Sequence, residues 1–244
     1  MRRDALLVEF LGLPGAGKSA LSRRLAEVLQ AQGLAVDEPS RALAHGSGRG
    51  ARALRKLLRV ALESLARPLA SARAARAIAA SGQAPTAGAA HLWFNWLLVS
   101  SLARRARRRA GVHLLDEGPC QGAWSVALEG DPEAARALLS GLPAEARSDL
   151  LVVVEAPAPV VAARIRARRE RDSRLDRRLD AEPELLQRAE RTLIGIRSAL
   201  ESATRPGGAL DVFVLANVQA SDLDRGAGAL AERILAALRR SGTS

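Results

Sequence analysis

Short apolar segments recur along the chain, and each one ends in a polar or glycine-rich break. Segments that are apolar almost throughout, without strict alternation, are typical of strands buried on both faces of a parallel sheet. The pattern therefore predicts about five parallel strands. They cover residues 5–10, 34–36, 112–115, 150–154 and 210–215.

Between these segments the apolar residues follow a helical spacing. Leu21, Leu25 and Leu29 lie on one face of a helix over 18–32, which Gly33 ends. Strands that alternate with helices predict an α/β fold whose parallel sheet has helices on both faces. No internal repeat or linker is apparent, so residues 1–244 are interpreted as one domain. Further helices are predicted over 51–80 with a break near Pro68, over 91–109, from 122, from 132, over 160–171, over 183–200 and from 222.

The break after the first strand carries the most specific motif. Residues 12–19 (GLPGAGKS) fit the pattern G-x-x-x-x-G-K-[ST] and lie between a strand and a helix. Glycines let backbone N–H groups wrap around a phosphate, and a helix N-terminus favours the same anion. The motif predicts that Lys18 reaches the β- and γ-phosphates of ATP and that Ser19 binds Mg²⁺. The nucleotide contacts are assigned to Gly12, Pro14, Gly15, Ala16, Gly17, Lys18, Ser19 and Ala20.

Composition changes how the basic residues are interpreted. The formal net charge is +11, but Lys18 and Lys56 are the only lysines among 37 basic residues. So strong a preference for arginine, with abundant alanine, is typical of a GC-rich genome, and nucleic-acid binding is not favoured on charge alone. One of the two lysines nevertheless stands where a phosphate loop needs a compact ammonium group.

Two classes of protein are disfavoured by the sequence. The longest strongly apolar run lies near residues 92–102, whereas a membrane-spanning helix needs about 20 such residues. The N-terminus shows neither the apolar region nor the cleavage site of a secretory signal, and Cys120 alone cannot form an internal disulfide. We expect a cytoplasmic protein, and a homodimer is left open.

Carboxylates follow two of the predicted strands. Asp116 and Glu117 close the strand over 112–115, and Glu38 follows the strand over 34–36. Because the carboxyl ends of parallel strands border the ligand crevice, Asp116 is predicted to hold Mg²⁺ through water. Glu38 is the preferred general base for a hydroxyl acceptor, and Glu117 is the second choice. For each acid, a solvated turn is the alternative.

A series of arginines follows the fourth strand. Arg164 and Arg168 are four residues apart and share a helix face, and Arg169, Arg171 and Arg174 come after them. An arginine segment of this kind can close over the γ-phosphate and offset the charge that develops during transfer. The alternative is a solvated helix face.

Together these features resemble the P-loop nucleoside and nucleotide kinases, nearest the thymidylate kinase group. The resemblance rests on residues 12–19, Glu38-Pro39, Asp116 and the run VVVEAPAPVVAARIRARRERDSRLD at 152–176. It implies a three-layer P-loop NTPase fold with the P-loop strand at the centre of five. It also implies acceptor-site helices in an insert over about 41–110, and a lid over about 164–182 in which Arg164 and Arg168 act on ATP. Asn217, after the fifth strand, corresponds to a position that contacts the base.

The chain departs from that group in three places. Gly118-Pro119 follow Glu117 where many such kinases have an arginine that grips the acceptor, and Ser40-Arg41 replace the Gly-Gly of the thymidylate enzymes. Tyrosine is absent, so base stacking would fall to other aromatic residues, for which the core is the alternative. These departures widen the acceptor class beyond thymidylate. The remaining candidates for stacking are Trp93, Phe94, Trp96 and Trp124.

The leading hypothesis is a kinase that transfers the γ-phosphoryl group of Mg-ATP to a small-molecule acceptor through a hydroxyl or phosphate group. The alternative is an ATP-binding switch or ATPase acting on a protein or nucleic-acid partner, in which Asp116 and Glu117 hold Mg²⁺ and activate water. A third hypothesis is a kinase of polynucleotide ends that uses the basic surface to hold phosphates.

Overall fold

A parallel sheet forms the centre of the computed structural model, which describes residues 5–44, 48–82, 86–167, 182, 184–203 and 210–241. Within these residues the sheet has five strands in the order β2-β3-β1-β4-β5, and every neighbouring pair is parallel. This confirms the predicted α/β fold, with the P-loop strand in the middle. The strands are β1 (Ala5–Gly12), β2 (Val36–Asp37), β3 (Gly111–Leu115), β4 (Leu150–Glu155) and β5 (Asp211–Ala216).

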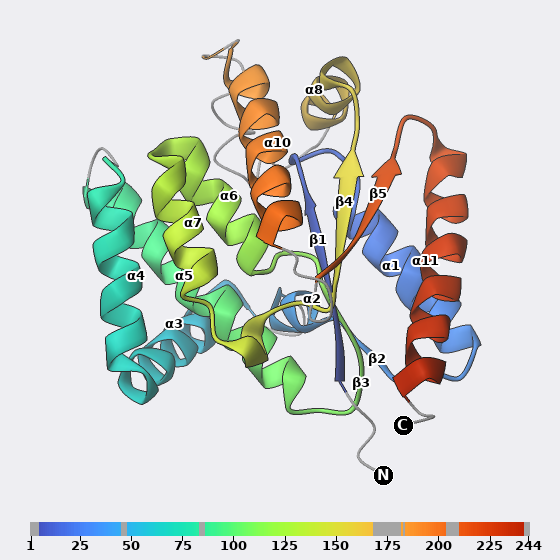
Figure 1. Ribbon diagram of the computed structural model, residues 1–244, viewed down its shortest axis with the longest axis horizontal. Coiled ribbons are helices and arrows are strands. Elements are labelled where there is room, and N and C mark those ends of the chain that lie inside the picture. The colour runs from blue at the N-terminus through green and yellow to red at the C-terminus, as the bar shows by residue number, and fades with distance from the viewer. Residues whose placement is uncertain are drawn as a thin grey trace.

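Helices cover both faces of the sheet (Figure 1). On one face α1 (Lys18–Ala31) packs against α11 (Ala220–Ser241). On the other face α5 (Thr86–Arg107) and α6 (Pro119–Glu129) contact β1, and α10 (Leu185–Ala203) packs on α6. Three layers result, as the resemblance implies. The shorter elements near them are α7 (Pro132–Ser140), the 3₁₀ turn η1 (Ala144–Ala146) and α8 (Ala158–Arg166).

The segment predicted as a helical insert contains α2 (Pro39–Ala44), α3 (Arg49–Ala66), α4 (Pro68–Ala80) and α5. The break near Pro68 is confirmed, because α4 begins at that proline, where a missing backbone N–H costs nothing. The same reason moves the start of α6 to Pro119, earlier than the predicted residue 122. The second strand also differs from the prediction, since only Val36 and Asp37 pair with β3.

The central strand β1 is almost completely buried. Leu7, Val8, Phe10 and Leu11 have no exposed surface, and burying each such side chain stabilises the fold by roughly 1.5–3 kcal/mol. These contacts hold the carboxyl end of β1, and thus the loop that follows it, at a defined place on the sheet edge. No helix in the described part of the chain is long and apolar enough to cross a bilayer.

Candidate active site

The loop after β1 is shaped by three glycines. Gly15 and Gly17 have φ angles of +86° and +106°, which side-chain-bearing residues rarely adopt. A Cβ atom at Gly12 would lie 2.5 Å from the carbonyl oxygen of Val154 on the neighbouring strand β4. At Gly17 it would collide with the side chain of Asn217. The loop therefore needs glycine at these places both for its turn and for its close packing against β4 and the end of β5.

Two residues predicted from the motif, Lys18 and Ser19, meet Asp116 from the end of β3 at the start of α1. The Lys18 ammonium group donates to the carbonyl oxygens of Gly12 (2.8 Å) and Leu13 (3.2 Å), so it lies over the loop itself. The Ser19 hydroxyl donates to Asp116 Oδ2 at 2.6 Å. The other carboxylate oxygen of Asp116 is buried and has no hydrogen-bond partner among the described residues. Such an unpartnered oxygen beside a hydroxyl suits a hydrated divalent cation, which prefers oxygen ligands.

Glu38 follows β2, and its carboxylate lies between α1 and α2. One of its oxygens accepts a hydrogen bond from Ser22 Oγ at 3.1 Å, and the other lies 3.0 Å from the guanidinium group of Arg41. Ser40 Oγ donates to the carbonyl oxygen of Glu117 at 3.5 Å, a long hydrogen bond. The structure thus brings the segments that carry Glu38 and Glu117 together, as the strand-end argument predicts.

The Glu117 carboxylate carries a raised pKa although its side chain reaches solvent. The main cause is crowding by protein atoms, which disfavours the charged form, and the negative charge of Asp116 adds to it. The ammonium groups of Lys18 and Lys56 act in the opposite direction and lower this pKa. Solvent access limits the size of the net shift.

The sequence analysis did not single out Lys56. It comes from α3, yet its charge acts on Glu117 at the end of β3. Both lysines of this arginine-rich chain therefore bear on the same carboxylate. The signal available in the sequence for Lys56 was its rarity, since it is one of only two lysines among 37 basic residues.

Asn217 and Arg164 support the phosphate loop from the side of β4 and β5. The buried Asn217 amide donates to the carbonyl oxygen of Ala16 at 2.5 Å. The guanidinium group of Arg164 donates to the same oxygen at 3.4 Å and to Asn217 O at 3.2 Å. Their contacts with a nucleotide stay predictions. Arg168, Arg169, Arg171 and Arg174 lie outside the described residues.

Gln121 contacts the loop and Glu9 holds the backbone of Gln121 in place, and neither residue was predicted. Gln121 Oε1 accepts a hydrogen bond from the Gly12 amide at 3.2 Å. Glu9, buried in β1, accepts from the amides of Cys120 (2.6 Å) and Gln121 (3.2 Å), and from the Ser148 hydroxyl (2.8 Å). A glutamate inside an otherwise apolar strand was the available signal for Glu9. Nothing in the local sequence distinguishes Gln121.

The Glu9 carboxylate shows how burial competes with hydrogen bonding. Burial raises its pKa, and the hydrogen bonds from Ser148, Gln121 and Cys120 lower it, with burial the larger effect. The first amides of α6 point at the carboxylate, and a Cβ atom at Gly118 would lie 2.5 Å from Glu9 Cδ. A side chain at position 118 would therefore collide with Glu9, which explains the glycine there. In many of the kinases that the sequence resembles, an arginine follows the acid of this strand instead.

We expect Glu9→Gln to flatten the pH dependence of stability. The unfolded chain releases the Glu9 proton near the ordinary value of 4.5 and the folded chain only at a higher pH. The free energy of unfolding of the wild type therefore falls as pH rises between these two values, and then stays level. Glutamine cannot titrate, so its variant lacks this fall.

Urea unfolding at a series of pH values measures this difference. Glu232→Gln is the matched control, because Glu232 is exposed on α11 and its replacement leaves the wild-type slope in place. Parallel pH curves for the wild type and Glu9→Gln would contradict the assignment of a raised pKa to Glu9.

The aromatic residues divide between the core and its margin. Trp96 and Trp124 are buried, and Trp124 Nε1 donates to Ala189 O at 3.1 Å. Trp93 is half-buried and donates to Ser71 O at 3.2 Å, and Phe94 is also half-buried. Trp96 and Trp124 therefore belong to the core, the alternative given above for base stacking.

No group of three or more potential metal-binding side chains occurs among the described residues.

Comparison with solved structures places this geometry in a known fold. The chain aligns with thymidylate kinase from Ehrlichia chaffeensis over 95% of its length and 99% of that chain, with a TM-score of 0.54 and 12% sequence identity. It aligns with deoxyadenosine kinase from M. mycoides, bound to dCMP and dCDP, over 95% and 100%, with a TM-score of 0.53 and 12% identity. The chain has the P-loop kinase fold. The strand order and the flanking helices agree with that fold.

The similarity is one of structure and not of sequence. No protein-family model matches the chain, and no curated protein sequence matches it significantly. At 12% identity the similarity shows the fold of this chain, and its function has to be argued from the side chains of the site.

Proposed function

We propose that this protein transfers the γ-phosphoryl group of Mg-ATP to a small-molecule acceptor, a nucleoside, a nucleotide or another compound with a hydroxyl or phosphate group. The observation that carries the proposal is the 2.6 Å hydrogen bond between Ser19 and Asp116. It joins the last residue of the phosphate-loop motif to a carboxylate from the neighbouring strand end. The unpartnered Asp116 Oδ1 beside it supports a cation site.

The phosphate side of the site follows from the loop. Lys18 and the N-terminal end of α1 supply positive charge where the β- and γ-phosphates would lie. Ser19 and Asp116 would hold Mg²⁺, which when bound offsets the charge of the phosphate oxygens. Arg164 lies against the loop at Ala16, and we propose that it and Arg168 contact the nucleotide there.

The acceptor side is formed by Glu38, Glu117 and Lys56. For a hydroxyl acceptor, Glu38 accepts the proton, because it lies at the sheet edge with hydrogen-bonding partners that orient it. Glu117 is the second candidate. Lys56 supplies a positive charge near Glu117, which suits an acceptor that carries a phosphate or another anionic group. Proteins of similar fold include a thymidylate kinase and a deoxyadenosine kinase, which places nucleosides and nucleotides first among the acceptors to test.

The test is consumption of ATP in the presence of Mg²⁺ across a panel of nucleosides, nucleoside monophosphates, sugars and aminoglycosides, with an acceptor-free control. We expect a large increase with one acceptor class and formation of the phosphorylated product. With a hydroxyl acceptor, Glu38→Gln should lower transfer far more than Glu117→Gln. Steady hydrolysis that no acceptor changes would overturn the proposal in favour of an ATPase that acts on a partner.

A further inference from the structure

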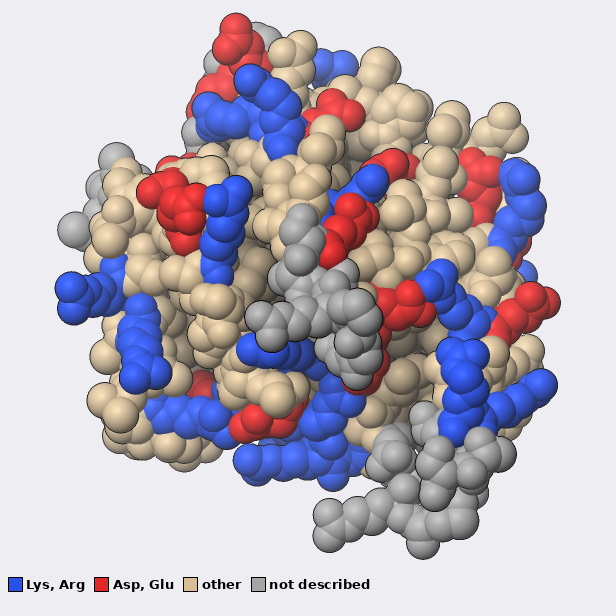
Figure 2. Space-filling model, in the orientation of Figure 1, with Lys and Arg blue, Asp and Glu red and all other residues tan. Residues whose placement is uncertain are grey.

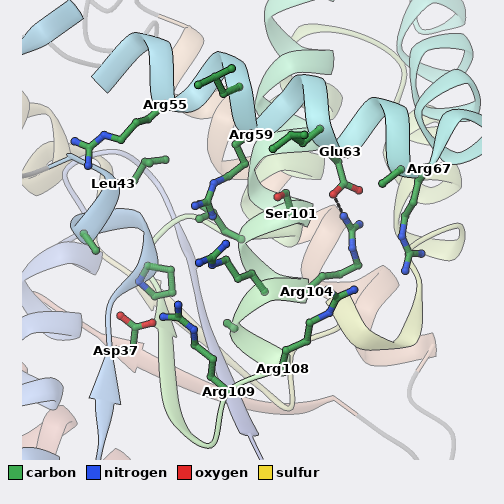
Figure 3. Close-up of a pocket in the computed structure, with 18 residues that line it drawn as sticks. Asp37, Leu43, Arg55, Arg59, Glu63, Arg67, Ser101, Arg104, Arg108 and Arg109 are labelled. Carbon is green, nitrogen blue, oxygen red and sulfur yellow. Dashed lines mark ion pairs between the residues drawn. The ribbon is translucent and has the colours of Figure 1, made fainter. Parts of the chain in front are cut away.

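A cavity whose wall includes no residue of the phosphate loop lies between α2, α3 and the end of α5. Its volume is about 580 Å³, and seven arginines and two carboxylates line it. Figure 3 shows Arg59 from α3 and Arg109 from the segment after α5 pointing toward the same space. None of Lys18, Glu38 and Asp116 is among the described residues of its wall. The wall does include Asp37 and Pro39, the neighbours of Glu38, so the cavity adjoins the acceptor side of the candidate active site but does not contain its side chains.

Four of the seven arginines in this cavity form no ion pair with a carboxylate of the described residues. Arg104 forms an ion pair with Glu63, and Arg67 Nη2 lies 2.5 Å from Glu145 Oε1. Four other arginines of the wall have no carboxylate within ion-pair distance in the described part of the chain. These four are Arg59, Arg105, Arg108 and Arg109.

The unpaired arginines also repel one another. Burial lowers the pKa of Arg59, and the charges of Arg105 and Arg109 lower it further. Burial likewise lowers the pKa of Arg104; the negative charge of Glu145 raises it, and the positive charge of Arg108 lowers it by a smaller amount. Like charges held this close destabilise the folded chain unless an anion lies between them. Basic side chains also gather along the lower edge of the molecule as seen in Figure 2.

The same cavity has an apolar wall. Leu43 and Leu102 are buried there, whereas Leu58 and Leu62 on α3 are 54% and 67% exposed. Cavities of several hundred Å³ are the size of sites for nucleotide-sized ligands. A ligand that fits this wall therefore combines anionic groups with an apolar portion.

We propose that the cavity is a second anion-binding site, which takes a molecule with two or more phosphate groups and an apolar portion, independently of the phosphate loop. The planar fork of arginine binds phosphate oxygens in pairs, and four unpaired forks exceed what a single phosphate group needs. Leu58 and Leu62 would contact the apolar portion. This chemistry is shared by a free nucleoside polyphosphate and by the headgroup region of an anionic phospholipid, and the test distinguishes the two sources.

Binding is measured on the full chain carrying Lys18→Ala, which weakens the phosphate loop, in buffer with EDTA. One arm titrates ATP by calorimetry, and the other measures co-sedimentation with phosphatidylcholine vesicles with or without cardiolipin. We expect binding in at least one arm. Binding of ATP alone identifies a free nucleotide as the source, and binding only to cardiolipin vesicles identifies a lipid headgroup.

The decisive comparison uses two double variants that remove the same charge. Arg105→Ser with Arg109→Ser should weaken binding at least about tenfold, since each lost guanidinium group removes a charge-assisted hydrogen bond. Arg73→Ser with Arg76→Ser, on the exposed surface of α4 outside the cavity, should change binding less than about twofold. Equal effects of the two pairs, or no binding in either arm, would overturn the proposal.

Thermal unfolding tests whether the cavity variant (Arg105→Ser with Arg109→Ser) is folded. Without ligand the cavity variant should melt at the same temperature as its parent or higher, because it relieves repulsion among arginines. The probe that binds, ATP or cardiolipin vesicles, should raise the melting temperature of the parent and not that of the cavity variant. If the probe raised the melting temperature of the cavity variant by the same amount, the proposed binding site would be wrong. These readouts need no phosphoryl transfer, so they stand or fall separately from the proposed kinase activity.

Discussion

Lys18→Ala is expected to lower the rate of phosphoryl transfer about 100- to 1000-fold, the usual effect of removing one group that stabilises transition-state charge. The Lys18 ammonium group lies over the loop, within hydrogen-bond distance of the carbonyl oxygens of Gly12 and Leu13. Alanine keeps the helix that begins at this residue but leaves no positive side chain to face the phosphates. The measurement is the turnover number with the acceptor that the panel identifies.

Two further variants make this result specific. Lys18→Arg keeps the charge but replaces a compact ammonium with a planar fork, and we expect a loss nearly as large. Arg24→Ala is the control, since Arg24 is exposed on the same helix and forms surface ion pairs with Glu27 and Asp224; its loss should leave turnover nearly unchanged. Wild-type turnover in a folded Lys18→Ala protein would remove the phosphate loop from the mechanism.

Asp116→Asn is expected to lower turnover about 100-fold and to raise the Mg²⁺ concentration required for half-maximal rate. Asparagine has nearly the shape of aspartate and can still accept the hydrogen bond from Ser19. Asparagine lacks the negative charge, so a cation would bind far more weakly at the place of Asp116 Oδ1, the oxygen without a hydrogen-bond partner among the described residues of the wild type. The shift in Mg²⁺ dependence separates a metal-holding role from a merely structural one.

Asp131→Asn provides the matched control for the same chemical change. Asp131 caps α7 by accepting a hydrogen bond from the Glu133 amide, and asparagine caps helices about as well. This variant should keep both the turnover and the Mg²⁺ dependence of the wild type. An Asp116→Asn enzyme with an unchanged Mg²⁺ requirement would show that Asp116 does not hold the metal.

The sequence predicted those parts of the site whose signals are local. The motif over 12–19 joins β1 to α1 in the structure, as its mechanism requires, and Asp116 directly follows β3 as predicted. Each of these signals depends on residues next to one another in the chain, such as an apolar run, a glycine turn or a helix start. The departure at the second strand was small and concerned its ends, where pairing with β3 decides the limits.

Residues whose partners are distant in the sequence were harder to predict from the sequence. Gln121 supports Gly12 from more than a hundred positions away, and nothing in its neighbourhood marks it. Lys56 acts on Glu117 only because α3 folds back toward the end of β3. The resemblance assigns Asn217 to the base, and this contact stays a prediction. The structure adds a hydrogen bond from its amide to the carbonyl oxygen of Ala16, which the sequence did not predict.

The sequence by itself determined the strands, most of the helices and the chemistry of the phosphate loop, since these follow from periodicity and from turn residues over short spans. The sequence analysis assigned Ser19 and Asp116 to one cation, and the tertiary structure decided the direct hydrogen bond between them at neighbouring strand ends. It also decided that arginines from α3 and from the end of α5 surround one cavity. The physical reason is that such contacts depend on strand order and helix packing, which bring together residues with no relation in the local pattern.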